Sequence, residues 1–115
     1  GATFPKGTTT VIWTVTDASM NTTTCSFDVV VSDNEDPSIA CVANQPKDTD
    51  AGACIYTVLG TEFDPTDSDD NCPGSTIKND FNNSATLDGA IFQKGTTTVV
   101  WTVTSSVWTR PESNC

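Results

Sequence analysis

Five cysteines are the residues of this chain whose type points most directly to chemistry. Thiols at this density in a chain of 115 residues usually form disulfides in an oxidising compartment. Their spacing lacks the close Cys pairs of a zinc site, and the chain has no histidine to supply a nitrogen ligand. An odd number leaves one thiol for a neighbouring repeat or molecule, or for a partner outside the fragment. The cysteines are Cys25, Cys41, Cys54, Cys72 and Cys115.

Acidic and amide side chains in loops form the second candidate group. The chain has 15 Asp and Glu against 5 Lys and Arg, a formal net charge of -10. Hard oxygen ligands suit Ca²⁺, and a bound cation would relieve the repulsion between these charges. A solvated acidic surface that keeps the protein soluble explains the same composition, so both interpretations stay open. The candidate calcium ligands are Asp17, Asn21, Asp33, Glu35, Asp36, Asp69 and Asp70.

Two asparagines begin N-glycosylation sequons, Asn21-Thr22-Thr23 and Asn82-Asn83-Ser84. Such short motifs often arise by chance. Asn21 and Asn82 are therefore candidate glycan carriers only if the source organism attaches N-linked glycans.

The composition argues against several functional classes. So few basic residues could not displace the counterions of a nucleic acid. No apolar run approaches the ~20 residues that cross a bilayer, and position 1 falls inside a β pattern, as in a mature fragment. Without an imidazole base or a recognisable cofactor motif, we predict that the chain is not an enzyme and binds no organic cofactor.

An internal repeat shows which elements position these residues. Residues 1–16 and 89–104 are identical at thirteen of sixteen positions, with an offset of 88. Such identity does not arise by chance, so the chain is interpreted as a window of a tandem array. Residues 1–33 are predicted to be the C-terminal hairpin of one repeat, and residues 34–115 a second repeat with a divergent tail over 105–115.

The repeated block alternates apolar and polar residues as a half-buried strand does. Val11, Trp13 and Val15 share one face, and residues 25–31 alternate in the same way after a turn at 17–21. Residues 8–31 therefore predict an antiparallel hairpin, with Trp13 and its equivalent Trp101 as core anchors.

The rest of the chain is punctuated by Gly, Pro, Asp and Asn clusters and has no helical periodicity. Many short strands separated by turns predict a β-sandwich. The further predicted strands cover 38–43, 53–59, 75–79, 84–87 and 96–104.

The motifs resemble those of the hyalin repeat (HYR) family. The first part reads Phe4-Pro5-Lys6-Gly7-Thr8-Thr9, then Trp13, Asp17-Ala18-Ser19-Met20-Asn21 and Thr24-Cys25-Ser26-Phe27. The second part reads Asp36-Pro37-Ser38-Ile39-Ala40-Cys41, Gly52-Ala53-Cys54 and Asp70-Asn71-Cys72. The resemblance extends nearly to Thr104 and implies an all-β fold, an immunoglobulin-like antiparallel β-sandwich in tandem repeats. Met20 replaces the family's turn glycine, which predicts a positive φ at Met20 or a different turn type.

The resemblance also implies a disulfide pattern. An immunoglobulin-like strand order pairs Cys72 with Cys115 and leaves Cys41 and Cys54 to join the first two strands. Cys25 then belongs to the preceding repeat and pairs with a cysteine of a neighbouring repeat or molecule, expected to be its Cys72. The offset of 88 places the equivalent of Cys25 at Ser113, inside the divergent tail.

These features together predict a structural protein, an extracellular repeat that builds a fibre, stalk or filament and is secreted or attached to the cell surface. Its partners would be neighbouring repeats or identical subunits, its stabilisers disulfides and, at acidic linkers, calcium. The alternative is an adhesin-type binding module that recognises a glycan or a cell-surface protein through loop 60–74. Neither nucleic-acid binding nor membrane insertion is expected.

Overall fold

The computed structural model describes residues 1–106 and 112–115. It divides into two compact units, Gly1–Asn34 and Glu35–Cys115, whose boundary lies one residue from the predicted one. The described residues form nine β-strands, every pair of which is antiparallel. This part of the chain contains no helix long and apolar enough to cross a membrane. The predicted all-β, antiparallel class is confirmed.

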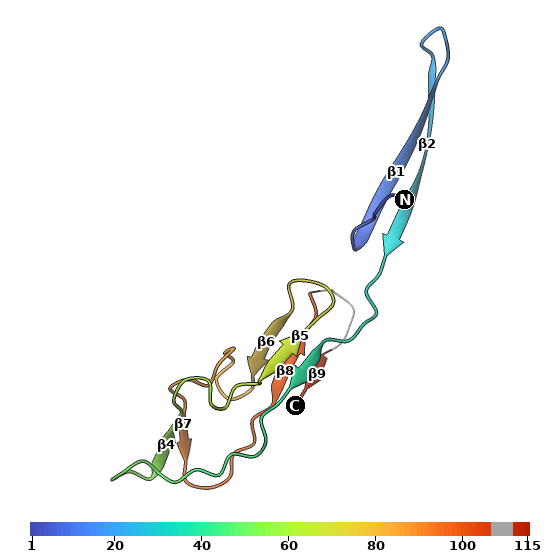
Figure 1. Cartoon of the computed structure of the whole chain (residues 1–115). Coiled ribbons are helices and arrows are strands. Elements are labelled where there is room, and N and C mark those ends of the chain that lie inside the picture. The colour runs from blue at the N-terminus through green and yellow to red at the C-terminus, as the bar shows by residue number, and fades with distance from the viewer. Residues whose placement is uncertain (107–111) are drawn as a thin grey trace. The chain divides into compact units, whose positions relative to one another are not determined.

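Unit 1 is a long hairpin of β1 (Gly7–Thr16) and β2 (Thr22–Val31), drawn in blue and cyan in Figure 1. The strands pair along their whole length, with Trp13 opposite Cys25. β-Branched Thr, Val and Ile dominate both strands and suit an extended ladder. The predicted hairpin at 8–31 is confirmed.

The turn of this hairpin is built around Asp17. Its carboxylate accepts hydrogen bonds from the backbone N–H groups of Ser19 and Asn21, at 2.8 and 2.9 Å. The Met20 N–H donates to the Asp17 carbonyl at 3.1 Å, and Met20 adopts a φ of 69°. Met20 therefore occupies the left-handed conformation expected where the HYR pattern has glycine.

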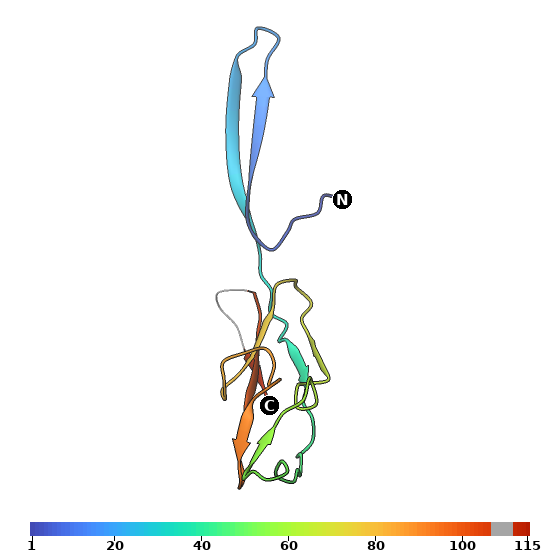
Figure 2. The same cartoon turned by 90° about the vertical axis from the view of Figure 1, so that its left-hand side faces the viewer.

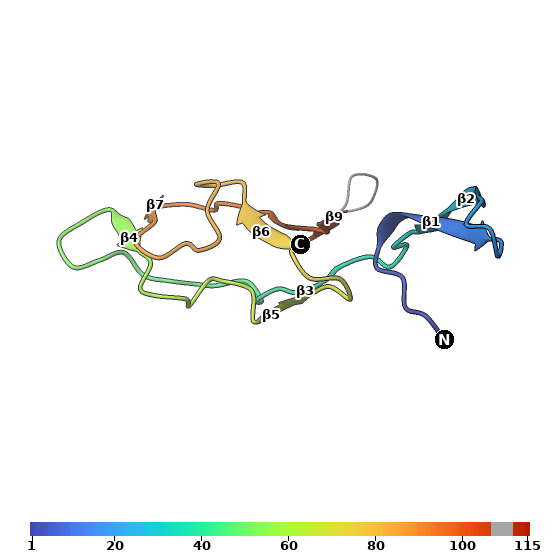
Figure 3. The ribbon, with the colours of Figure 1, turned by 90° about the horizontal axis from the view of Figure 1, so that it is seen from above.

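Unit 2 contains seven short strands arranged in three small sheets, β3–β5, β4–β7 and β6–β8–β9. Figures 2 and 3 show β3–β5 facing β6–β8–β9, with β4–β7 at one end of the unit. These pairings do not establish the larger sheets of an immunoglobulin-like sandwich. The strands are β3 (Ser38–Ala40), β4 (Ile55–Thr57), β5 (Asp67–Asp69), β6 (Thr76–Asn79), β7 (Ile91–Gln93), β8 (Trp101–Thr104) and β9 (Glu112–Asn114).

One predicted strand of unit 2 is absent, and the other four are shorter in the structure. Residues 84–87 have bent and irregular backbone. The predicted strands 38–43, 53–59, 75–79 and 96–104 become β3, β4, β6 and β8, whereas β5, β7 and β9 were not predicted. Leu87 is nevertheless buried, and its backbone N–H donates to the Asp64 carboxylate at 2.8 Å.

The core of unit 2 is formed by Val58, Leu87 and Trp101, all of which are buried. Aromatic rings extend it, since Phe92 contacts Phe63 and Phe81 at ring-centroid distances of 5.9 and 4.4 Å. Trp101 is thus a core anchor, as the alternation predicts.

Candidate functional site

A disulfide joins the two facing layers of unit 2. Cys41 follows β3 and Cys115 follows β9, and their Cα atoms are 6.1 Å apart. The backbone N–H and C=O of Cys115 both bond to Trp101, at 2.9 and 2.7 Å. The Ser113 hydroxyl also donates to the Pro37 carbonyl. The β9 segment is therefore attached to the beginning of unit 2 by a covalent bond and a hydrogen bond.

This disulfide corrects the pairing that the HYR resemblance implied. Cys115 bonds to Cys41 and not to Cys72, and Cys41 is consequently not the partner of Cys54, which is exposed and lies outside any disulfide. The reason is topological. β9 is the edge strand of its sheet and contacts β3, whereas Cys54 precedes β4, which pairs with β7. Cys25 in unit 1 is an exposed thiol.

The register of β9 identifies Cys115 as the equivalent of Cys25. Trp13 lies opposite Cys25 in unit 1, and Trp101 exchanges both backbone hydrogen bonds with Cys115 in unit 2. The residues two positions on also correspond, because Val15 faces Thr23 and Val103 faces Ser113. The connection over 105–111 is two residues longer than that over 17–21, which explains why the offset of 88 points to Ser113.

The two equivalent hairpins differ in what covers their apolar face. Trp101 is 4% exposed and Val103 is 1% exposed, because unit 2 packs against them. Trp13 is 64% exposed and Val15 is 67% exposed. The prediction that Trp13 is a core anchor is therefore wrong within unit 1, although the same residue type is buried at the equivalent position in unit 2.

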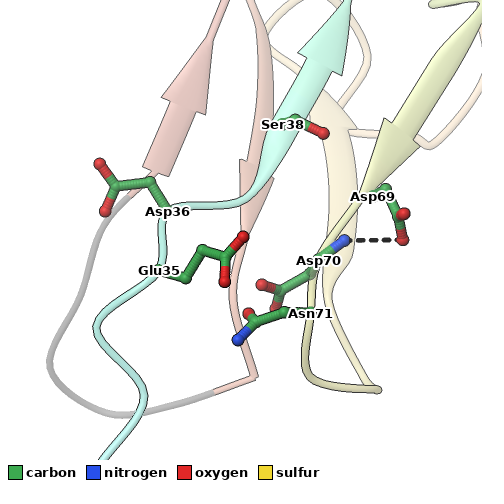
Figure 4. Close-up of a pocket in the computed structure, with 6 residues that line it drawn as sticks. All are labelled: Glu35, Asp36, Ser38, Asp69, Asp70 and Asn71. Carbon is green, nitrogen blue, oxygen red and sulfur yellow. Dashed lines mark hydrogen bonds between the residues drawn. The ribbon is translucent and has the colours of Figure 1, made fainter.

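An acidic pocket lies between the beginning of unit 2 and the residues after β5 (Figure 4). Its lining includes four of the seven candidate calcium ligands. Both carboxylate oxygens of Asp70 are buried and accept no hydrogen bond from the described residues, while the Asp70 N–H donates to Asp69 at 2.9 Å. The lining residues are Glu35, Asp36, Ser38, Asp69, Asp70 and Asn71.

Asp70 is the residue of this pocket whose buried charge lacks a compensating partner among the described residues. A buried carboxylate without hydrogen bonds is costly unless a cation or a donor compensates its charge. In Figure 4 the side chains of Glu35, Asp70 and Asn71 turn toward the same space. Among the described residues, however, no group of three or more acidic or cysteine side chains is gathered closely enough to hold a metal ion. The pocket is thus not a preformed cation cage.

The other three candidate calcium ligands lie in unit 1 and have contacts there. The Asn21 amide donates to Asp17 at 2.9 Å, and this bond is the main reason why the pKa of Asp17 is lowered. Asp33 forms an ion pair with Lys6, with 3.2 Å between Nζ and Oδ2. These contacts explain the three residues as parts of a turn and a strand end.

Loop 60–74, the predicted adhesin surface, is largely part of the framework. It contains β5, which pairs with β3, and Glu62, whose carboxylate gathers three donors. Lys47 Nζ donates to Glu62 at 2.6 Å, the Tyr56 hydroxyl at 2.5 Å and the Leu59 N–H at 3.1 Å.

The side chains of Glu62, Lys47 and Tyr56 shift one another's pKa values. The bonds from Lys47 and then Tyr56 lower the pKa of Glu62 to about 2. The Glu62 carboxylate in turn raises the pKa of Lys47 and of Tyr56. The ionised Glu62 therefore joins the first turn of loop 60–74 to Lys47 and Tyr56. No local sequence motif predicts this role.

Asn79 is a second residue that the sequence analysis missed. It is 1% exposed, its amide donates to the Ser84 carbonyl, and its side-chain oxygen accepts from the N–H groups of Phe81 and Asn82. Buried polar groups of this kind shape loops because each of their hydrogen bonds is satisfied internally. An Asn after a strand is a weak signal on its own, since turns commonly contain one.

Both sequon asparagines are exposed, and both donate their side-chain nitrogen within a turn. Asn21 donates to Asp17, and Asn82 donates to the Thr86 carbonyl at 3.1 Å. A glycan would be attached to that same nitrogen. Glycosylation at Asn21 and Asn82 stays a prediction.

Comparison with known proteins found one similarity, which covers the unit 1 hairpin. Residues 1–31 match the family model of the HYR domain, which agrees with the resemblance found in the sequence. The HYR domain is an extracellular, non-enzymatic repeat. Searches of curated proteins and of solved structures gave no significant match.

Proposed function

We propose that this chain is a load-bearing extracellular repeat, part of a fibre, stalk or filament built from immunoglobulin-like units. The HYR match of residues 1–31, the all-β fold and the Cys41–Cys115 disulfide support this function. The function is mechanical and is not enzymatic.

The disulfide carries the proposal, because it makes a short covalent path for tension. Force that enters unit 2 through residues 32–37 reaches Cys41 soon after β3 begins. It then crosses the sulfur–sulfur bond directly to Cys115. Cys115 corresponds to Cys25 of unit 1. In unit 1 the chain runs from this cysteine along the rest of β2 to the acidic connector at residues 32–37.

The rest of unit 2 is thereby relieved of load. The two cysteines are separated by 74 positions in the sequence. Once reduced, such a segment can extend by roughly 250 Å, given the reach of an extended chain per residue. While oxidised, the unit cannot lengthen by unfolding. A repeat with this connection suits a filament that must keep its length outside the cell.

The first test of this proposal is a peptide map of the native protein, digested without reduction. We expect one major linked peptide pair containing Cys41 and Cys115. A map in which Cys115 is linked to Cys72 would remove the covalent path and with it the mechanical argument.

Calcium is proposed as a second stabiliser at the acidic pocket. The supporting observation is the pair of buried, unpartnered Asp70 oxygens, beside five further oxygen-bearing side chains. Ca²⁺ accepts irregular sets of carboxylate, amide and hydroxyl oxygens together with water. Binding would draw the lining residues closer together than they lie here. The adhesin function through loop 60–74 stays a prediction.

A further inference from the structure

The apolar face of the β1–β2 hairpin is an unpaired surface of unit 1. On this face Val11 lies opposite Phe27, and Trp13 lies opposite Cys25. Phe27 is 52% exposed, and Trp13 and Val15 are more exposed still. A contiguous apolar surface on a long two-stranded hairpin is typical of a site that another chain covers.

We propose that this face binds a polypeptide segment with the chemistry of residues 35–88, supplied by another repeat unit. We further propose that Cys25 forms a disulfide with the cysteine at the Cys41 position of that segment. The inference rests on the repeat character proposed above and names the partner of unit 1.

Unit 2 shows how such a segment covers the equivalent hairpin. Trp101 is buried against Val58 and Leu87, both of which come from residues 35–88. Since Trp13 and Trp101 are equivalent by sequence and by register, the same kind of apolar residues should bury Trp13. The surface that would cover Trp13 is therefore one that residues 35–88 of this chain already provide for Trp101.

The backbone edge of β1 that does not pair with β2 also supports a segment of the 35–88 type as the occupant. In unit 2, β6 pairs with β8 and places Asn79 opposite Trp101 and Lys78 opposite Thr102. In unit 1, β2 is the one described strand that pairs with β1, so within residues 1–106 and 112–115 the other edge of β1 presents backbone N–H and C=O groups without a strand. A β6-like strand would pair with that edge by strand addition.

The occupant that we propose is a further copy of the 35–88 segment. The segment in unit 2 is already engaged, since its β6 pairs with β8. A second hairpin laid face to face would bury the apolar residues but would leave the β1 edge unpaired. A 35–88 segment satisfies both the apolar face and the edge.

The covalent step is an ordinary thiol oxidation. The thiols of Cys25 and of the partner's cysteine each lose a proton and together lose two electrons, and one sulfur–sulfur bond forms. A small-molecule disulfide such as oxidised glutathione accepts the electrons and protons and becomes two thiols.

The experiment mixes the oxidised full chain with a synthetic peptide of residues 35–88 in a glutathione buffer. The peptide carries Cys54→Ser and Cys72→Ser, so that Cys41 is its single thiol. We expect a one-to-one adduct whose peptide map links Cys25 to Cys41. A matched peptide with Cys41→Ser and Cys72→Ser, which keeps Cys54, should give no adduct above background.

Two variants of the full chain separate recognition from thiol reactivity. Trp13→Ala should lower the yield of adduct roughly hundredfold, by analogy with the loss of a buried aromatic anchor. Cys25→Ser should abolish the covalent adduct but still bind the peptide, as seen by tryptophan fluorescence. Neither variant touches the Cys41–Cys115 bond of unit 2, which the peptide map monitors as a folding control.

Three outcomes would overturn the inference. One is equal adduct formation by both peptides, which would mean unspecific thiol exchange. The second is linkage of the peptide to Cys115, and the third is a Cys25–Cys25 dimer of the full chain that excludes the peptide. The mechanical function rests on the Cys41–Cys115 bond of unit 2 and would survive the first and third of these results, whereas linkage to Cys115 would count against both proposals.

Discussion

At the scale of single residues, Glu62 is the clearest case of a side chain that holds unit 2 together through its charge. The donors from Lys47 and Tyr56 hold its pKa at about 2, well below the ordinary value of 4.5. A carboxyl group whose folded pKa is depressed stabilises the fold above its unfolded pKa, and this contribution is lost as the pH falls. The stabilisation by Glu62 should therefore be lost between about pH 4.5 and about pH 2.

Glu62→Gln should accordingly lower the urea midpoint of unfolding at pH 7 and flatten its decline below pH 4.5. The amide keeps the size of the side chain but loses the charge that Lys47 and Tyr56 stabilise. Asp48→Asn is the matched control, because Asp48 is an exposed carboxylate in the same unit. Identical pH profiles for wild type and Glu62→Gln would show that the network does not contribute to stability.

Asp70 supports a second prediction at this scale. If Ca²⁺ binds the acidic pocket, it should raise the melting temperature of the wild-type protein, and chelation with EDTA should reverse the effect. Asp70→Asn should be insensitive to calcium and, in EDTA, more stable than wild type, because it removes a buried unpaired charge. Differential scanning calorimetry measures both effects. A wild-type melting temperature unaffected by calcium and EDTA would end the calcium proposal.

Residue types in the site were predictable from the sequence, but their partners were not. The acidic residues 35, 36, 69 and 70 are four of the seven candidate calcium ligands, and they line one pocket, whereas the other three lie in unit 1. Glu62 and Asn79 were missed because their roles depend on groups that chain folding brings together from other segments. The Cys115 pairing was misplaced because it followed an immunoglobulin-like strand order, whereas β9 lies at the edge of its sheet and contacts β3.

At the scale of elements, the turn of the β1–β2 hairpin contains strain that one substitution can relieve. Met20 holds a φ of 69°, which costs a side-chain-bearing residue about 1 kcal/mol relative to glycine. Met20→Gly should therefore raise the hairpin population of unit 1, and Met20→Ala should not. Cross-strand nuclear Overhauser effects between Trp13 and Cys25 measure that population. A lower population in Met20→Gly than in wild type would contradict the strain argument.

Elements with regular alternation were predictable, and elements fixed by tertiary contacts were not. The alternation of β1 and β2 is strong over ten residues each, so the hairpin was predicted with close bounds. β5 reads Asp67-Ser68-Asp69 and has no apolar signal; it forms because β3 pairs with it. The predicted strand over 84–87 is absent, and the Leu87 N–H there donates to the Asp64 carboxylate and not to a neighbouring strand.

At the scale of the whole molecule, nearly the same hairpin sequence occurs twice, once with its apolar face buried and once with it exposed. In unit 2 its apolar face is buried and its strand is linked to β3 through Cys41–Cys115. In unit 1 the same face is exposed, and the equivalent cysteine is a thiol. This difference is what a reiterated unit produces when the hairpin is seen once with its covering segment and once without it.

Disulfides, and not strand pairing alone, should determine how far the molecule can stretch. Unit 1 should extend at low force in any buffer, because no disulfide spans it. Unit 2 should extend only after Cys41–Cys115 is broken. Cys41→Ser should behave as the reduced protein in every buffer, whereas Cys54→Ser should behave as wild type.

Single-molecule force spectroscopy of the full chain, with handles before Gly1 and after Cys115, tests this most directly. Without reductant, we predict extension of unit 1 and none from the 74-position span between Cys41 and Cys115. After addition of a reductant, a further extension of roughly 250 Å should appear. Full extension of unit 2 without reductant, or no gain after reduction, would contradict a load-bearing covalent path.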